Sequence, residues 1–157
     1  MSSNEVLNVC TTSVDFEVAK SLTLSYFQWL EMDLDFQNTE KEFEVFTEMY
    51  GYPKGCFLYL KVNEIIAAGV GIRKLTNETC EMKRLFVFPE FQKRGYGRRL
   101  CEDIISRAKN LGYTKMRLDT VSRLKSANAL YESIGFYDIP AYYNNPNSTV
   151  RYMELTF

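Results

Sequence analysis

The chain has 157 residues, of which 46% are apolar and 25% charged, and its formal net charge is −1. A chain of this length can bury roughly two-thirds of its unfolded surface, so we expect one domain over residues 1–157. The near-zero charge argues against a general nucleic-acid binder, because clustered Lys and Arg would normally raise the charge of the whole domain. Without an apolar run of about 18 residues or a basic-then-apolar leader, the sequence predicts a cytoplasmic protein that binds no membrane.

The chain has four cysteines and no histidine, which limits the metal sites and nucleophilic pairs that it can form. Cys10, Cys56, Cys80 and Cys101 are far apart and form no C-x-x-C pair, so the sequence predicts reduced core thiols and no metal site. Without histidine, Ser-His and Cys-His nucleophile pairs are excluded as well.

The N-terminal third predicts a strand and two helices. Residues Glu5–Cys10 alternate as a strand does, and Thr12 with Asp15 can begin the first helix. The capping box Thr39-x-x-Glu42 predicts the start of the second helix, and Gly51 is expected to end it.

The middle of the chain predicts three strands. Segments 56–62 and 65–72 are joined by Asn63-Glu64, which suits a tight hairpin. The third strand, Thr79–Phe88, is the long central one. Strict alternation along it divides the side chains into two sets. One face is expected to carry Cys80, Met82, Arg84, Phe86 and Phe88, and the other Glu81, Lys83, Leu85 and Val87.

The last third alternates helices with strands. A helical stripe begins near Gly97 and closes at Gly112, a strand covers 115–121, and a helix runs from about Ser126 to Ile134. Residues 137–142 and 150–157 are predicted as the final strands. The whole order, βααβββαβαββ, indicates a mixed α/β sandwich.

The stretch Gln92–Arg99 is the most informative part of the sequence. Two glycines stand between basic residues where a helix begins, so free backbone N–H groups and the helix dipole favour an anion such as phosphate. A dinucleotide fingerprint would need a small residue at Leu100, and a P-loop would need Gly-Lys-Ser/Thr; the sequence has neither.

Gln92-x-x-Gly95-x-Gly97 is similar to the Q/R-x-x-G-x-G/A pyrophosphate motif of the GNAT N-acyltransferase superfamily. Residues 80–87 resemble that family's fourth strand and residues 128–136 its last helix and turn, in the same order and spacing. The resemblance implies an α/β (α+β sandwich) fold, with a mixed, mostly antiparallel sheet and helices on both faces. It also implies acetyl-CoA-dependent N-acetyltransferase activity, with acetyl-CoA as co-substrate and no metal.

The resemblance further assigns roles to residues. Backbone N–H groups of a bulge at Leu85–Val87 would hold the pantetheine arm and polarise the thioester carbonyl. Asn128 would hydrogen-bond the same arm, and Tyr131 would act as general acid toward the departing thiolate. The expected cofactor-binding residues are Leu85, Phe86, Val87, Gln92, Lys93, Arg94, Gly95, Tyr96, Gly97, Arg98, Asn128 and Tyr131.

Glu81 is the candidate general base. A carboxylate near the middle of a splayed strand can take the ammonium proton directly or through water. The alternative is an ordinary carboxylate paired with Lys83 or Arg73. If the amine is already neutral at the site, no dedicated base is required.

The acceptor site of this family lies between the first two helices and the last strands. There the chain combines acids with aromatic side chains, which suits a cationic amine. A solvated loop beside core tyrosines is the alternative. The expected substrate-binding residues are Glu31, Asp33, Asp35, Phe36, Tyr142 and Tyr143.

The predicted function is acetyl transfer to a primary amine of a small molecule by direct attack in a ternary complex. One alternative is a protein acetyltransferase acting on an N-terminal amine or a lysine. Another is a weakly catalytic acyl-CoA-binding sensor. The expected partners are the amine acceptor and, if the chain is not monomeric, a second copy in a homodimer; no nucleic-acid partner is expected.

Overall fold

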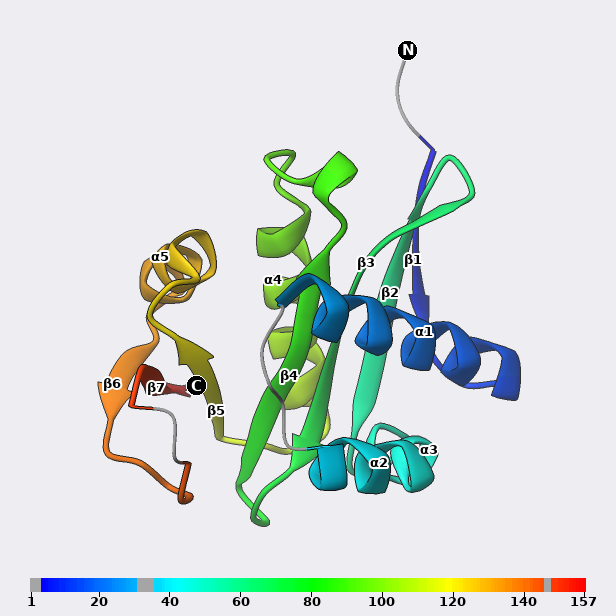
Figure 1. Ribbon diagram of the computed structural model, residues 1–157. Coiled ribbons are helices and arrows are strands. Elements are labelled where there is room, and N and C mark those ends of the chain that lie inside the picture. The colour runs from blue at the N-terminus through cyan, green and yellow to red at the C-terminus, as the bar shows by residue number, and fades with distance from the viewer. Residues whose placement is uncertain (1–3, 31–35, 146–147) are drawn as a thin grey trace.

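A seven-stranded sheet organises the molecule (Figure 1). The structure, a computed structural model, describes residues 4–30, 36–145 and 148–157. The strand order is β1-β2-β3-β4-β5-β7-β6, with β4 and β5 parallel and every other neighbouring pair antiparallel. The strands are β1 (Glu5–Val9), β2 (Cys56–Val62), β3 (Ile65–Lys74), β4 (Thr79–Val87), β5 (Lys115–Val121), β6 (Tyr137–Ile139) and β7 (Val150–Thr156).

Helices cover both faces of this sheet. In Figure 1 α1 crosses in front of β2–β4, and α4 lies behind the same strands. The predicted mixed sheet with helices on both faces is therefore confirmed. The helices are α1 (Ser13–Leu30), α2 (Phe36–Glu44), α3 (Phe46–Met49), the 3₁₀ turn η1 (Pro89–Phe91), α4 (Tyr96–Asn110) and α5 (Lys125–Ile134).

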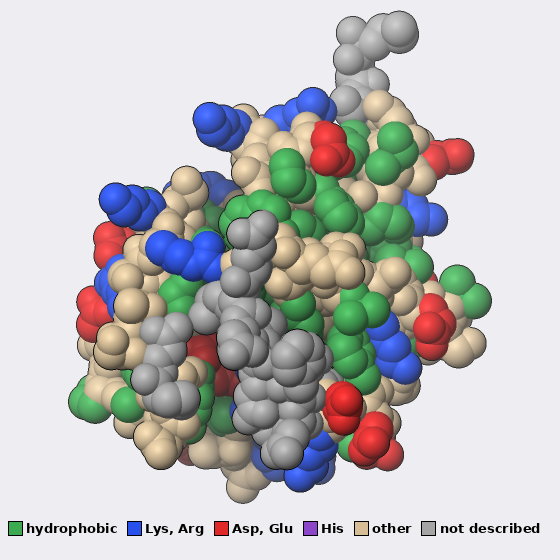
Figure 2. Space-filling model, viewed as in Figure 1, with side chains coloured by type: hydrophobic (Ala, Val, Ile, Leu, Met, Phe, Trp, Pro, Cys, Tyr) green, Lys and Arg blue, Asp and Glu red, His purple; other side chains and the backbone are tan. Residues whose placement is uncertain are grey.

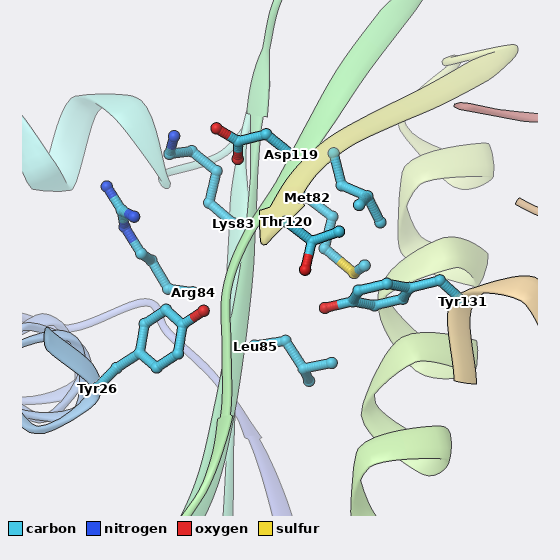
Figure 3. A pocket seen from close by; sticks show the side chains of 9 residues that line it. Tyr26, Met82, Lys83, Arg84, Leu85, Asp119, Thr120 and Tyr131 are labelled. Carbon is cyan, nitrogen blue, oxygen red and sulfur yellow. The ribbon is translucent and has the colours of Figure 1, made fainter. Parts of the chain in front are cut away.

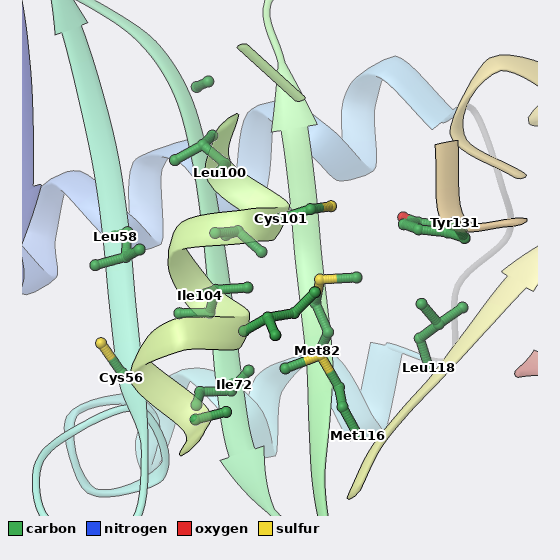
Figure 4. Close-up of a cluster of buried hydrophobic side chains, with 14 of the residues drawn as sticks. Cys56, Leu58, Ile72, Met82, Leu100, Cys101, Ile104, Met116, Leu118 and Tyr131 are labelled. Atoms are coloured by element: carbon green, nitrogen blue, oxygen red, sulfur yellow. The ribbon is translucent and has the colours of Figure 1, made fainter. Parts of the chain in front are cut away.

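Two apolar clusters lie on the two faces of β2. Leu58 and Leu60 pack with α4 residues such as Ile104 on one face, as the close-up in Figure 4 shows for part of this cluster. On the other face Phe57 and Tyr59 pack against α1 and α3. Because both faces are covered, six of the seven β2 residues are buried. The central strands therefore form a rigid base for the site beside them.

The hairpin and the strand at 115–121 agree with the sequence predictions. Asn63 and Glu64 form the two-residue turn with φ of 50° and 68°, the left-handed pair that matches the twist of a hairpin. The four cysteines are buried and free, as expected. Burial raises the pKa of Cys80 and of Cys101 to about 12.

The second helix differs from its prediction. It begins at Phe36, so Thr39 lies inside α2 and is not its cap, and the chain breaks at Val45 before the short α3. Glu42 does not cap the helix start; its carboxylate accepts hydrogen bonds from Arg84 of β4. A tertiary ion pair thus replaces the local capping interaction that the pattern suggested.

A bulge in β4 overturns the predicted alternation. Gly69 of β3 pairs with Phe86 and Gly71 pairs with Lys83, so Arg84 and Leu85 together face one β3 residue. The extra residue reverses the faces beyond it. Cys80 and Met82 belong to the cluster beneath α4, and Leu85 and Val87 also pack there, whereas Phe86 packs with α1.

Candidate active site

The site lies where β4 and β5 separate. Their pairing is limited to three register pairs, ending at Glu81 and Arg117. Beyond that point β5 still pairs with β7 but, among the described residues, no longer with β4, and Figure 1 shows β4 and β5 diverging toward the end where α5 begins. Two cavities lie along this opening, and Tyr26, Leu85 and Tyr131 line both of them.

The larger cavity is a cleft of about 400 Å³. Its walls are the last residues of β4, the loop that leads to α4, and the first turns of α5. Of the residues predicted to bind the cofactor, those that line it are Leu85, Phe86, Val87, Gln92, Lys93, Gly95, Tyr96, Gly97 and Tyr131. The structure thus gathers most of the predicted set around one cleft.

Gly95 shapes the end of this cleft. It stands at the N-cap of α4 with φ of 84°, a conformation that costs glycine little, and a Cβ added there would meet nothing within 4 Å. The first N–H groups of α4 have no partner within the helix, because the first turn of any α-helix leaves them free. Gln92 supports the loop through a hydrogen bond of 3.0 Å from its Nε2 to the Val87 carbonyl.

Three residues of the predicted set are absent from the cleft lining. Arg94 lies over the Phe91 ring at 5.5 Å, and Arg98 donates a hydrogen bond of 2.5 Å to Ser133 of α5. Asn128 is buried and joins α5 to β5: its Oδ1 accepts from Thr120 at 2.8 Å and its Nδ2 donates to the Val121 carbonyl at 3.0 Å. Their cofactor contacts stay predictions.

The smaller cavity, about 40 Å³, fills the gap between β4 and β5. Figure 3 shows the Tyr131 hydroxyl pointing into the gap from α5, opposite the hydroxyl of Tyr26 from α1. Among the described residues, the Tyr131 hydroxyl has no hydrogen-bond partner. Burial raises the pKa of Tyr131 well above its ordinary value, so the phenol stays protonated at neutral pH.

Glu81 lies outside both cavities. It is 1% exposed, and its carboxylate accepts hydrogen bonds from Arg73 Nε at 2.8 Å and from the Tyr142 hydroxyl at 2.5 Å, with Lys83 Nζ at 3.4 Å. Burial alone would raise the pKa of Glu81, but the two cations and the tyrosine outweigh it and hold that pKa below its usual value. The arrangement matches the ion-paired alternative, and the role of general base stays untested.

The predicted acceptor residues are only partly described. Glu31, Asp33 and Asp35 lie outside the described residues, as does the side chain of Phe36, the first residue of α2. Tyr142 and Tyr143 lie edge to face at 5.5 Å. The Tyr143 hydroxyl donates to Asp119 of β5, while that of Tyr142 donates to Glu81.

Sequence reasoning missed Asp119 and Tyr26. Asp119 lines the smaller cavity together with Tyr131, and it is the only acid of its strand, a signal that was available in the sequence. Tyr26 lies in α1, and its ring packs against Phe86 at 5.5 Å. Because it also lines both cavities, it serves the core and the site together.

Basic side chains flank the larger cleft. Lys93, Arg123 and Lys125 line it, and Arg123 also donates a hydrogen bond to the Leu30 carbonyl at the end of α1. Figure 2 shows Lys and Arg side chains at the upper left of this face, where Figure 1 places the loop before α4 and helix α5. Such a rim attracts a polyanion.

No described helix is long and apolar enough to cross a membrane.

Comparison with known proteins agrees with this geometry. The model of the acetyltransferase (GNAT) family matches residues 23–136. A Schizosaccharomyces pombe protein named as an uncharacterized N-acetyltransferase is 37% identical over 155 residues, which cover 98% of this chain and 95% of the relative.

Solved structures share the fold at lower identity. An acetyltransferase of Streptococcus agalactiae superposes with a TM-score of 0.79 at 20% identity, covering 98% of both chains. The putative acetyltransferase YncA of Salmonella typhimurium, solved with acetyl-CoA, gives a TM-score of 0.68 at 18% identity and covers 98% of this chain and 94% of its own.

The chain belongs to the GNAT acetyltransferase family. It is an acetyl-CoA-dependent N-acetyltransferase, as the sequence predicted.

Proposed function

We propose that the chain transfers the acetyl group of acetyl-CoA to a primary amine of a small molecule, by direct attack in a ternary complex. The observation that carries the proposal is the position of Tyr131. Its protonated hydroxyl has no partner among the described residues, and its ring lines both the larger cleft and the smaller cavity. A donor in the cleft and an acceptor in the cavity would therefore meet beside one proton donor.

Three groups supply the chemistry in this proposal. Asp119 accepts the proton that an ammonium must lose before its nitrogen can attack. Backbone N–H groups at the β4 bulge stabilise the negative charge on the carbonyl oxygen while the N–C bond forms. As the C–S bond breaks, Tyr131 gives its proton to the sulfur. The nitrogen loses its second proton to water, from which Tyr131 regains its own.

Asp119 suits the role of proton acceptor better than Glu81 does. Both are carboxylates on the strands that border the opening. Glu81 faces two cations and a tyrosine and lies outside the cavities, whereas Asp119 lines the smaller cavity and accepts a hydrogen bond from the Tyr143 hydroxyl. We therefore assign the base to Asp119 and an ion-paired structural role to Glu81.

The test is CoA release from acetyl-CoA with a panel of amines: polyamines, amino acids, aminoglycosides and short peptides, with products confirmed by mass. We expect turnover with one class of small amine. The variant Tyr131→Phe should bind acetyl-CoA with unchanged affinity in calorimetry and turn over about 10²-fold more slowly, the usual effect of losing a general acid.

Other outcomes would redirect the proposal. Turnover with peptides alone would assign a protein acceptor. Tight binding of acetyl-CoA without turnover on any amine would favour the sensor function. Equal turnover in wild type and Tyr131→Phe would remove the acid role of that tyrosine.

A further inference from the structure

Arg84 has an unusual backbone conformation at the centre of the site. Its φ is 63°, in the left-handed region where the Cβ of any residue other than glycine is crowded. Glycine would adopt this conformation easily. Because the chain has arginine there, the side chain must supply something that holds the conformation in place.

The Arg84 side chain is fixed by α2. Its Nε donates to Glu42 Oε2 at 3.0 Å and its Nη2 donates to Oε1 at 2.6 Å, a two-pronged contact that sets the plane of the guanidinium. Glu42 is 6% exposed and also accepts from the Tyr50 hydroxyl at 3.4 Å. The guanidinium lies over the Phe27 ring at 4.7 Å.

The same residue sets the direction of the next part of β4. Arg84 and Leu85 are the two bulge residues that face one residue of β3. Without the extra residue, Leu85 would point to the opposite face of the sheet. As it stands, Leu85 lines both cavities, and Arg84 lines the smaller one with Tyr131.

We propose that Arg84 is a positioning residue for acetyl transfer: its ion pair with Glu42 holds the left-handed backbone at the bulge and thereby fixes the direction of the Leu85 amide. The inference rests on the proposed function, in which bulge N–H groups stabilise the carbonyl oxygen. It also gives α2 a part in catalysis, because Glu42 supplies the anchor from that helix.

Two double variants separate backbone conformation from charge. Glu42→Gln/Arg84→Gly and Glu42→Gln/Arg84→Met both lack the ion pair, but only glycine adopts φ near 63° without crowding. We expect kcat of the methionine variant to lie at least about tenfold below that of the glycine variant, the order expected when an oxyanion donor is misplaced. The two variants should bind acetyl-CoA with the same affinity, measured by calorimetry. Equal kcat in the two variants would overturn the proposal.

A matched control uses a second Arg–Glu pair away from the bulge. Arg117 Nε and Glu154 Oε1 are 2.9 Å apart on β5 and β7. Glu154→Gln should leave kcat within about twofold of wild type, because only the bulge pair acts on the amide. If Glu154→Gln lowers kcat as much as the methionine variant does, the effect belongs to general stability and the proposal fails.

Two further readouts keep the test decisive. If the methionine variant does not fold, Arg84→Lys replaces it: lysine keeps the charge but not the two-pronged contact, so kcat should fall at least about threefold. A kcat equal to that of the wild type in Arg84→Lys would contradict the inference.

If the wild type turns over no amine, the proposed function fails separately, and the positioning role of Arg84 is then tested by the NMR resonance of the Leu85 amide. Its shift on adding acetyl-CoA should persist in the glycine variant and vanish in the methionine variant; the same shift in both would refute the positioning role.

Discussion

The two ends of the β4–β5 pair use carboxylates in opposite ways. At the closed end, where the strands are hydrogen-bonded, Glu81 is buried and surrounded by Arg73, Lys83 and Tyr142. At the open end, Asp119 lines a cavity beside Tyr131.

The difference lies in surroundings and not in residue type. A carboxylate with all its neighbours in place is held ionised and stabilises the fold, and it is a weak proton acceptor because its pKa is lowered. A carboxylate on a cavity wall can still receive a new partner. Four substitutions or conditions can break or sharpen this contrast.

Asp119→Asn should have the largest effect. The amide keeps the shape of the side chain but cannot accept the ammonium proton, so kcat should fall about 10²-fold while acetyl-CoA affinity stays unchanged. The deficit should shrink as the pH approaches the pKa of the acceptor amine, because a neutral amine needs no base. Steady-state kinetics from pH 6 to about 10 would show this. A deficit that is constant over this range would argue against the base role. The control is Tyr143→Phe, which removes the hydrogen-bond donor of Asp119 but keeps the carboxylate.

Glu81→Gln should affect stability and not turnover. Gln keeps the shape but leaves Arg73 and Lys83 facing a neutral group, so the free energy of unfolding should fall by about 2 kcal/mol, the order of a charge-assisted hydrogen bond. Urea unfolding measures the loss, and kcat should stay within about twofold of wild type. A hundredfold loss of kcat in a folded Glu81→Gln protein would return the base role to Glu81.

Gly97→Glu tests acetyl-CoA binding at the open end. A Cβ at Gly97 would lie 3.5 Å from Leu130 and 3.9 Å from Val87, ordinary contact distances, so thermal stability should hardly change. The added carboxylate would repel the phosphates that approach the helix N-terminus, and acetyl-CoA affinity should drop at least roughly tenfold, or about 1.4 kcal/mol. Unchanged affinity in calorimetry would place the phosphates elsewhere.

The smallest expected effect is on acid stability. The pKa of Glu81 is lower in the folded chain than its ordinary value of 4.5, so its stabilisation is complete above that pH and is lost as the pH falls through the folded value. Glu81→Gln should therefore flatten the dependence of unfolding free energy on pH below about 4.5, by at most about 1.4 kcal/mol per pH unit. Parallel curves for the two proteins in urea melts at several pH values would contradict this.

Local patterns in the sequence sufficed for much of the fold. The strand at 115–121 and the hairpin turn at Asn63-Glu64 were predicted at their observed positions, because alternation and turn chemistry act over neighbouring residues. The glycine loop and Tyr131 both line the larger cleft, and their contacts with the cofactor stay predictions.

Long-range contacts account for what the sequence patterns missed. The resemblance implied a bulge at Leu85–Val87, but strict alternation takes no account of a bulge and placed Phe86 on the wrong face. The bulge residue Arg84 is anchored by Glu42, which is 42 positions away in the chain. Glu81 was the candidate base because it stands near the middle of the splayed strand, with pairing to Lys83 or Arg73 as the alternative, and only the folded sheet shows that both cations are its neighbours. Asp119 is the only acid of its strand, but that signal does not show that β5 leaves β4 beside it, so the residue was overlooked.

The burial of the four cysteines has a practical consequence for assays. Their thiols lie within the apolar clusters, and the pKa of Cys10, Cys80 and Cys101 is raised to about 12, so these groups stay protonated and shielded at neutral pH. The thiol of released CoA is free of that protection. A chromogenic disulfide reagent added to the native enzyme should therefore report product continuously over a low background, and denaturation should reveal four further equivalents.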